Sequence, residues 1–142
     1  MKLLMFLSLF MLLTNLNFKG DDITGYWKDS SGELIVKCYK YDTKYFARIV
    51  WFDNPNPNKL IYSEEGVPKN EWINYVVMRN FSFENDKWVN GVIHEIKNGK
   101  VYDANIEMIS LNKIIVRGYV YVPLLGRDIT FTRFTEKLPQ QK

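Results

Sequence analysis

The chain has 142 residues, of which 46% are hydrophobic and 25% are charged. This ordinary balance excludes a disordered tail, a collagen-like fibre and a highly charged linker, and the length suits a single domain. Residues 1–20 include Lys2 and Lys19, so a mature chain starting near Asp21 carries 17 basic against 16 acidic residues. With so little net charge, we expect no nucleic-acid partner.

Residues 1–20 have the layout of a signal peptide. Lys2 precedes an apolar run, Leu3–Leu13, that only Ser8 interrupts, and a polar stretch follows as far as Gly20. The run is too short to span a bilayer, which takes about 20 residues. We therefore expect a secreted or periplasmic protein that loses residues 1–20 and keeps no transmembrane anchor. The last residues, 139–142, form a polar tail.

The remaining residues, 21–138, have the pattern of antiparallel β-structure. Short runs rich in Val, Ile, Tyr, Phe and Trp alternate with turn residues such as Asp42 and Asn85, and no long window has a helical period. Nine strands are expected, at Ile23–Lys28, Glu33–Tyr41, Tyr45–Phe52, Lys59–Tyr62, Tyr75–Phe83, Lys87–Glu95, Lys100–Ile109, Lys113–Val122 and Arg127–Phe134. The sequence thus predicts an all-β fold, an up-and-down antiparallel barrel of about eight to nine strands, with a sandwich as the alternative.

One long irregular stretch interrupts the hairpins. It contains Asp53–Asn58 and Ser63–Trp72, and Glu64–Glu71 is compatible with a short turn of helix. Loops of this length in a compact domain often form lids or rims. We expect this one to border the mouth of the barrel.

Two separated motifs point to one barrel family. Gly25-Tyr26-Trp27 resembles the Gly-x-Trp signature of lipocalins and the wider calycin superfamily, in which the Trp plugs one end of the barrel. In those proteins an Arg of the last strand packs across the Trp, and Arg133 stands at that place. The resemblance implies that Gly25, Trp27 and Arg133 close one end of a lipocalin-like barrel.

A closer resemblance covers almost the whole mature chain. The chain is similar to a family of small exported bacterial proteins known as domain of unknown function two-one-four-seven. The matching segments are Gly25–Trp27, Ala47–Trp51, Asn54–Pro57, Trp88 with Gly91, Asn98–Tyr102, Val116–Tyr119, Pro123–Arg127 and Thr132-Arg133. Two positions depart from the family pattern: His94-Glu95-Ile96-Lys97 replaces a Tyr-Asp-Pro turn, and Ala47 stands where Gly is common. The resemblance implies export and a lipocalin-like fold, and it implies no established activity.

The residues that catalysis or metal binding would need are scarce. His94 is the single histidine and Cys38 the single cysteine, which we expect to be a small buried side chain. Glu64 and Glu65 are adjacent and would point apart on an extended chain. We therefore expect no enzyme activity, no metal and no cofactor.

Arg117 and Tyr119 share one face of a predicted strand. If that face lines the lumen, a guanidinium and a phenol converge there and suit a carboxylate. The other face carries Val116 and Gly118, and if it lines the lumen instead, Arg117 lies outside and pairs with a neighbouring carboxylate. Arg48 has the same two alternatives.

Aromatic side chains on predicted strands are candidates for the wall of a binding cavity. We name Trp51, Trp88 and Tyr102 as ligand contacts beside Arg117, Tyr119 and Arg48. An eight-stranded barrel is wide enough for one small ligand. The leading hypothesis is therefore an exported barrel that binds a small hydrophobic or amphipathic molecule, with an anionic end if Arg117 faces inward. The alternative is a filled barrel that binds an envelope or host protein.

Overall fold

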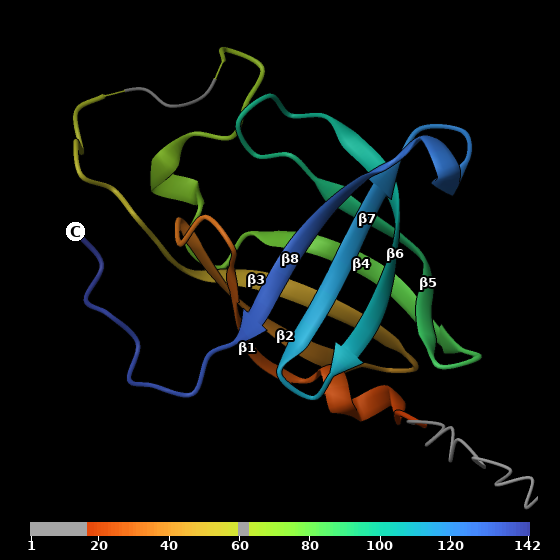
Figure 1. Ribbon diagram of the computed structural model, residues 1–142. Helices are drawn as coiled ribbons and strands as arrows, with labels where there is room; N and C mark the ends of the chain where they lie inside the picture. The colour runs from red at the N-terminus through yellow and green to blue at the C-terminus, as the bar shows by residue number, and fades with distance from the viewer. Residues whose placement is uncertain (1–16, 60–62) are drawn as a thin grey trace, which may run out of the picture.

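The computed structural model describes residues 17–59 and 63–142. In this part of the chain, eight antiparallel strands follow one another around a closed barrel, and β8 pairs with β1 to complete the ring (Figure 1). Each strand is hydrogen-bonded to its neighbours in sequence, which is an up-and-down topology. The predicted all-β barrel is confirmed, and the sandwich alternative is wrong.

The elements of the described chain are eight strands and three short 3-10 helices. In order, they are η1 (Gly20–Ile23), β1 (Gly25–Asp29), β2 (Leu34–Tyr41), β3 (Lys44–Phe52), η2 (Lys69–Glu71), β4 (Val76–Glu84), β5 (Lys87–His94), β6 (Val101–Ser110), β7 (Lys113–Tyr119), η3 (Pro123–Leu125) and β8 (Arg127–Arg133).

Two predicted strands need correction, and a third lies mostly outside the described residues. Ile23 belongs to η1 rather than to the first strand. β7 ends at Tyr119 rather than at Val122, because Tyr121 adopts a positive φ of 73° and Pro123 begins η3. The short strand predicted at Lys59–Tyr62 is not described beyond Lys59, which lies in a bend, because residues 60–62 are outside the described part.

The tight hairpins follow from residues that tolerate positive φ. Asn85 and Asp86 have φ angles of 51° and 61° between β4 and β5, and Asp42 has 56° between β2 and β3. Two successive positive φ angles match the right-handed twist of the flanking strands, and Asn and Asp adopt them readily. The turn residues named from the sequence therefore set these two hairpins.

Alternate connections lie at opposite ends of the barrel. The β2–β3, β4–β5 and β6–β7 hairpins lie at the end covered by η1, which we call the closed end. The β1–β2 turn, the long β3–β4 connection, the β5–β6 turn and the β7–β8 loop lie at the other end, the open end (Figure 1).

The core fills the barrel from the closed end. Trp27, Trp88, Phe81, Ile114 and Val116 are fully buried, and they come from alternate positions on their strands. Alternation of this kind directs one set of side chains into the barrel and the other set to the outside. Cys38 belongs to the inner set and is buried, as predicted.

Candidate ligand-binding site

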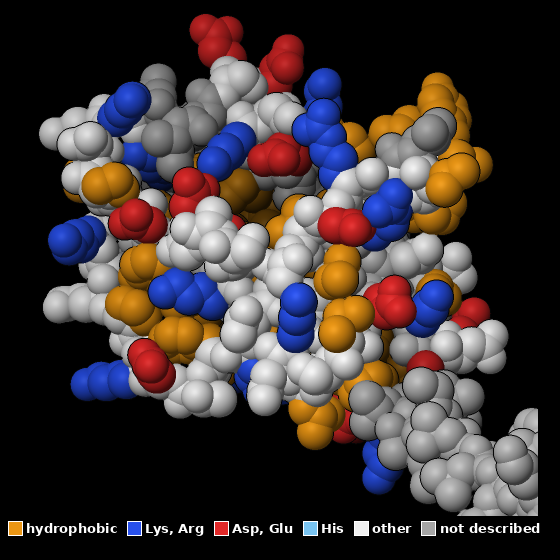
Figure 2. All heavy atoms as spheres, viewed as in Figure 1, with side chains coloured by type: hydrophobic (Ala, Val, Ile, Leu, Met, Phe, Trp, Pro, Cys, Tyr) orange, Lys and Arg blue, Asp and Glu red, His pale blue; other side chains and the backbone are white. Residues whose placement is uncertain are grey.

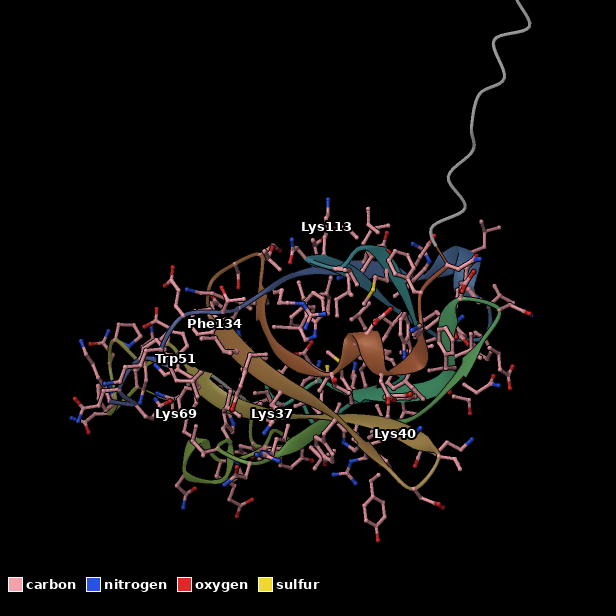
Figure 3. All side chains as sticks on the ribbon, turned by 90° about the horizontal axis from the view of Figure 1, so that it is seen from below. Lys37, Lys40, Trp51, Lys69, Lys113 and Phe134 are labelled. Carbon is pink, nitrogen blue, oxygen red and sulfur yellow. The ribbon has the colours of Figure 1, made fainter. Side chains whose placement is uncertain are left out.

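The closed end is sealed around Trp27. The ring is fully buried, and its Nε1 donates a hydrogen bond to the carbonyl oxygen of Ile23 in η1 at 2.8 Å. The centre of the Arg133 guanidinium lies 4.2 Å from the ring centroid, so the contact expected from the Gly-x-Trp signature is present. Figure 3 looks along the barrel from this end and shows the coil of η1 lying across it.

Arg133 also ties this end together through its polar atoms. It donates hydrogen bonds to the carbonyl oxygens of Asp22, Thr24 and Leu111 at 2.5, 2.9 and 2.6 Å. Asp22 lies in η1, Thr24 is the residue that ends this helix, and Leu111 lies in the β6–β7 hairpin. One side chain of the last strand therefore holds η1 and the hairpin together beside Trp27.

The backbone conformation at Gly25, the glycine of the signature, requires a residue without a side chain. Gly25 has φ at 115°, a region that L-residues rarely adopt. A Cβ at this position would lie 3.1 Å from Nη1 of Arg133. The three residues Gly25, Trp27 and Arg133 are thus one structural unit at the closed end.

Trp88 belongs to the same packed end. It is fully buried, its Nε1 donates to the carbonyl oxygen of Gly20 at 3.1 Å, and its ring centroid lies 4.8 Å from that of Phe83. Trp88 is not among the residues that line the cavity described next. The structure therefore places this predicted ligand contact in the core.

A cavity of about 800 Å³ occupies the open end of the barrel. Its walls are apolar at depth, where the buried side chains Val77, Met78, Val116 and Phe131 line it. In Figure 2 this end is hollowed, apolar side chains lie within the hollow, and charged side chains of both signs surround it. The arrangement is an apolar cup with a polar border.

The border of the cavity carries more acidic than basic side chains. The lining includes five carboxylates and two cationic side chains, namely Asp29, Glu33, Asp53, Glu95 and Asp128 against Lys97 and Arg127. Two carboxylates have ion-pair partners: Glu33 lies 3.3 Å from Nζ of Lys97, and Asp128 lies 2.8 Å from Nη1 of Arg117. The potential at the mouth therefore favours positive over negative charge.

Four consecutive residues at the end of β5 and in the β5–β6 connection line the cavity. They are His94, Glu95, Ile96 and Lys97. Nδ1 of His94 lies 3.5 Å from the hydroxyl of Tyr75, and desolvation together with the charge of Arg79 lowers the pKa of His94. His94 is therefore a neutral side chain of the wall at pH 7, and the sequence pattern did not identify it as a site residue.

The long β3–β4 connection borders the mouth as expected. Asp53, Pro55 and Trp72 line the cavity. Nε1 of Trp72 donates to the carbonyl oxygen of Val67 at 2.7 Å, and Lys69 donates to the side chain of Asn54 at 3.1 Å. Internal hydrogen bonds thus hold the described parts of this connection against the barrel.

Of the six predicted ligand contacts, Tyr102 and Tyr119 are among the residues that line the cavity, Tyr119 as the last residue of β7 at the open end, and Arg117 of the same strand face is not. Val116 and Gly118 face the lumen, so the intervening Arg117 lies on the outer surface, where it pairs with Asp128. Its Nε and Nη2 donate to the carbonyl oxygens of Pro123 and Leu124 at 2.5 and 3.1 Å. Of the two alternatives for Arg117, the outward side chain paired with a carboxylate is the one observed, and its prediction as a ligand contact is wrong because the more apolar face of β7 is the inner one.

Arg48 and Trp51 also lie outside the barrel. Arg48 alternates with the buried Ala47 and Ile49, and its guanidinium lies 5.6 Å from the ring centroid of Tyr39. Nζ of Lys28 lies 5.8 Å from the ring centroid of Trp51. Figure 3 shows Trp51 outside the barrel wall, on the same side as Phe134. Neither predicted contact belongs to the cavity.

The described residues hold neither a cluster of metal ligands nor a membrane-spanning helix. Within residues 17–59 and 63–142, no three His, Cys, Asp or Glu side chains lie close enough together to hold a metal ion. In the same described ranges, no helix is long and apolar enough to cross a bilayer.

With the barrel and its cavity described, the class of the protein is clear. Residues 25–133 match the sequence model of the bacterial family described as "Uncharacterized protein conserved in bacteria (DUF2147)". The match covers most of the chain, so the chain belongs to this family. No curated protein sequence matches it.

A solved structure has the same fold. Protein HP1028 from the human pathogen Helicobacter pylori, described as belonging to the lipocalin family, superposes with a TM-score of 0.61 and 14% sequence identity. The alignment covers 80% of this chain and 84% of the Helicobacter chain. The protein is therefore a lipocalin-like barrel in fold, and at this identity the similarity says nothing of the ligand.

Proposed function

We propose that the protein is exported and binds one small, largely apolar molecule in the cavity at the open end of its barrel, without chemical turnover. The observation that carries the proposal is the cavity of about 800 Å³ with apolar walls. Sites for small molecules typically measure about 300–1,000 Å³ and combine apolar walls with a few polar groups. A cavity of this size argues against the alternative of a filled barrel that acts only through a protein partner.

The polar end of the ligand is neutral or cationic in this proposal. Arg117, on which an anionic end depended, does not line the cavity and is paired with Asp128 of the border. The cavity border has a surplus of carboxylates, among which Asp53 and Glu95 have no ion-pair partner in the described residues. Tyr102 and Tyr119 belong to the same lining, and a tyrosine hydroxyl can donate or accept a hydrogen bond.

A fluorescence titration with two naphthalene probes tests the proposal. N-phenyl-1-naphthylamine is neutral, and 1-anilinonaphthalene-8-sulfonate has a similar ring system with a negative charge. We expect one neutral probe to bind per chain with a micromolar Kd, and the anionic probe to bind at least about fivefold more weakly, because the carboxylates repel it. Absence of saturable binding of the neutral probe would refute the cavity as a site.

Two charge-reversal variants compare the effect of a charge at the cavity border with the effect of a charge elsewhere on the surface. Glu95→Lys at the border should strengthen binding of the anionic probe and leave the neutral probe unchanged. Glu84→Lys is the matched control, since Glu84 is exposed in strand β4 next to the closed-end hairpin. At physiological salt a charge is screened beyond about 8 Å. Equal effects of both variants would contradict a local role for the border.

A second pair tests the apolar wall. Ile93 lines the cavity, whereas its neighbour Val92 is directed to the outside of β5. Ile93→Ser should weaken the neutral probe by about tenfold, because two or more buried CH₂ groups are lost at about 0.8 kcal/mol each. Val92→Ser should leave the affinity unchanged. The reverse order would place the probe outside the barrel.

Export is tested by the mass of the mature chain. When the full sequence is expressed in a bacterium, we expect the protein in the periplasm or medium, without the apolar run Leu3–Leu13. Intact-mass spectrometry of the fractionated cells measures this. Full-length protein confined to the cytoplasm would contradict export while leaving the binding proposal untouched.

A further inference from the structure

We propose that the apolar tip of the β7–β8 loop, defined as residues Val120–Leu124, inserts into the surface of a phospholipid bilayer and turns the open end of the barrel toward the membrane. The insertion is argued from the side chains of the tip alone. The consequence of insertion, exchange of an apolar ligand between bilayer and cavity, rests on the proposed function.

The tip exposes more apolar surface than any other short segment of the described chain. Tyr121 and Leu124 are 90% and 85% exposed, and Val120 and Val122 are 50% and 47% exposed. In Figure 2 these side chains form a group that projects at the upper right, where Figure 1 places the connection between β7 and β8. Four large apolar side chains in five residues are an unusual solvent-facing feature.

The loop is held in this conformation rather than free to fold back. Arg117 donates to the carbonyl oxygens of Pro123 and Leu124 at 2.5 and 3.1 Å and pairs with Asp128. The amide of Gly126 donates to the carbonyl oxygen of Pro123 at 3.1 Å. Tyr121 has φ at 73°, which is costly for a bulky side chain. A strained residue that points into solvent indicates a surface built for contact.

The shape and size of the tip favour a bilayer over a protein partner. A stable protein interface buries about 800 Å² and 20–30 residues on each side, far more than four side chains on a projecting loop provide. A bilayer needs no complementary shape. It accepts aliphatic side chains in its acyl region and a tyrosine at the level of the headgroups.

The charges near the tip specify how the contact is made. The charged side chains next to the tip are Arg117, which is paired with Asp128, and Arg127, and the cavity border as a whole has the surplus of carboxylates described above, so attraction to anionic lipids does not drive the contact. We therefore expect insertion by apolar side chains alone, equally into neutral and anionic bilayers and without loss at high salt.

The tip and the cavity lie at the same end of the molecule. Tyr119, which precedes the tip, Val120, which begins it, and Arg127, which follows it, all line the cavity. A barrel that docks by this tip presents its mouth to the membrane. An apolar ligand then moves between bilayer and cavity with little exposure to water.

Vesicle flotation tests the proposal with the mature full-length chain. The vesicles are phosphatidylcholine alone and phosphatidylcholine with phosphatidylglycerol. Leu124→Asp should lower the fraction bound to both at least tenfold, and Leu124→Gln should lower it in the same direction if the first variant folds poorly. Leu111→Asp is the matched control, because Leu111 is 55% exposed but lies in the closed-end hairpin, and it should bind vesicles like the unsubstituted protein.

Each other outcome overturns the proposal. If Leu124→Asp and the unsubstituted protein bind vesicles equally, the tip is not the membrane-binding element. Absence of vesicle binding by the unsubstituted protein would refute the proposal as well. Binding only to anionic vesicles, lost at high salt, would assign the contact to basic side chains elsewhere, such as Lys28 and Lys37. Capture of a defined protein that Leu124→Asp abolishes would assign the tip to a protein partner. The neutral probe titrated against Leu124→Asp without vesicles should keep its affinity, which separates failure of docking from failure of ligand binding.

Discussion

Gly25 and Arg133 are far apart in sequence, yet the position of the Arg133 guanidinium limits which residue fits at position 25. Gly25 keeps a φ of 115° directly beside Nη1 of Arg133, so a side chain there would meet both backbone strain and the guanidinium. We predict that Gly25→Ala lowers the free energy of unfolding by about 1–3 kcal/mol, measured by urea denaturation. Gly32→Ala is the control: its φ is 77° and a Cβ would meet nothing closer than Lys28 at 3.8 Å. An equal loss in both variants would deny the special role of Gly25.

Cys38 shows what burial does to a thiol. It is 3% exposed, and desolvation raises the pKa of Cys38 to about 12 although the charge of Arg133 opposes this. Since the thiolate is the reactive form, we predict no reaction with a thiol-specific reagent at pH 8 under native conditions and one equivalent in denaturant. Rapid labelling of the folded protein would contradict the packed closed end.

His94 gives the stability of the protein a pH dependence. Desolvation and Arg79 lower the pKa of His94 in the folded state, so the unfolded chain takes up a proton first as the pH falls. Stability is therefore full above the ordinary pKa of about 6.5 and decreases as the pH falls through it toward the lowered value. We predict a smaller loss for His94→Gln between pH 7.5 and 5.5, measured by urea midpoints.

Asp21 does not change its contribution in that window. The hydrogen bond from Tyr45 and the charge of Lys40 lower the pKa of Asp21 below its usual range, so its contribution changes only at more acidic pH. An unchanged midpoint difference in His94→Gln would mean that the imidazole is as well solvated folded as unfolded.

At the scale of elements, β7 could be predicted as a strand, but the face that it turns to the lumen could not. Alternation along Lys113–Tyr119 establishes a strand with two faces, but both faces are compatible with a lumen when seen in one sequence. The barrel decides between them because Ile114 and Val116 pack in the core and Asp128 of β8 lies opposite Arg117. The cross-strand carboxylate was not deducible without the register.

The β7–β8 connection was not predictable for a local reason. Val120, Tyr121 and Val122 have strand-forming side chains, so the pattern extended the strand through them. The positive φ of Tyr121 and the hydrogen bonds from Arg117 to η3 end it earlier. The cavity role of the segment from His94 to Lys97 could not be predicted for a different reason. These residues have no sequence pattern that indicates a binding site, and they border the cavity only because the barrel closes around it.

Arg117 acts in this account as a positioning residue for the apolar tip. We predict that Arg117→Ala speeds amide hydrogen exchange at Gly126, whose amide bonds to Pro123, by at least tenfold. The neutral probe should bind as before, because Arg117 lies outside the cavity. Lys113→Ala, at the start of the same strand, should change neither measurement. A large loss of probe affinity in Arg117→Ala would restore Arg117 to the binding site.

At the scale of the whole molecule, one end of the barrel is packed and the other end holds the cavity. The closed end holds η1, Trp27 and Trp88 in a packed core, and the open end holds the cavity. The fold was predictable because hairpin turns, strand alternation and the pair Trp27–Arg133 agree with one another. Most of the cavity contacts were not predictable, Tyr102 and Tyr119 excepted, because the interior of a barrel depends on which face of each strand turns inward.

Amide NMR during titration with N-phenyl-1-naphthylamine tests the central claim most directly. The account predicts saturable shifts at one equivalent, centred on residues that line the cavity, including Met78, Ile93, Tyr102 and Phe131, with little change around Trp88. Saturable shifts confined to the outer face around Arg48 and Trp51, or no saturable shifts at any residue, would contradict it.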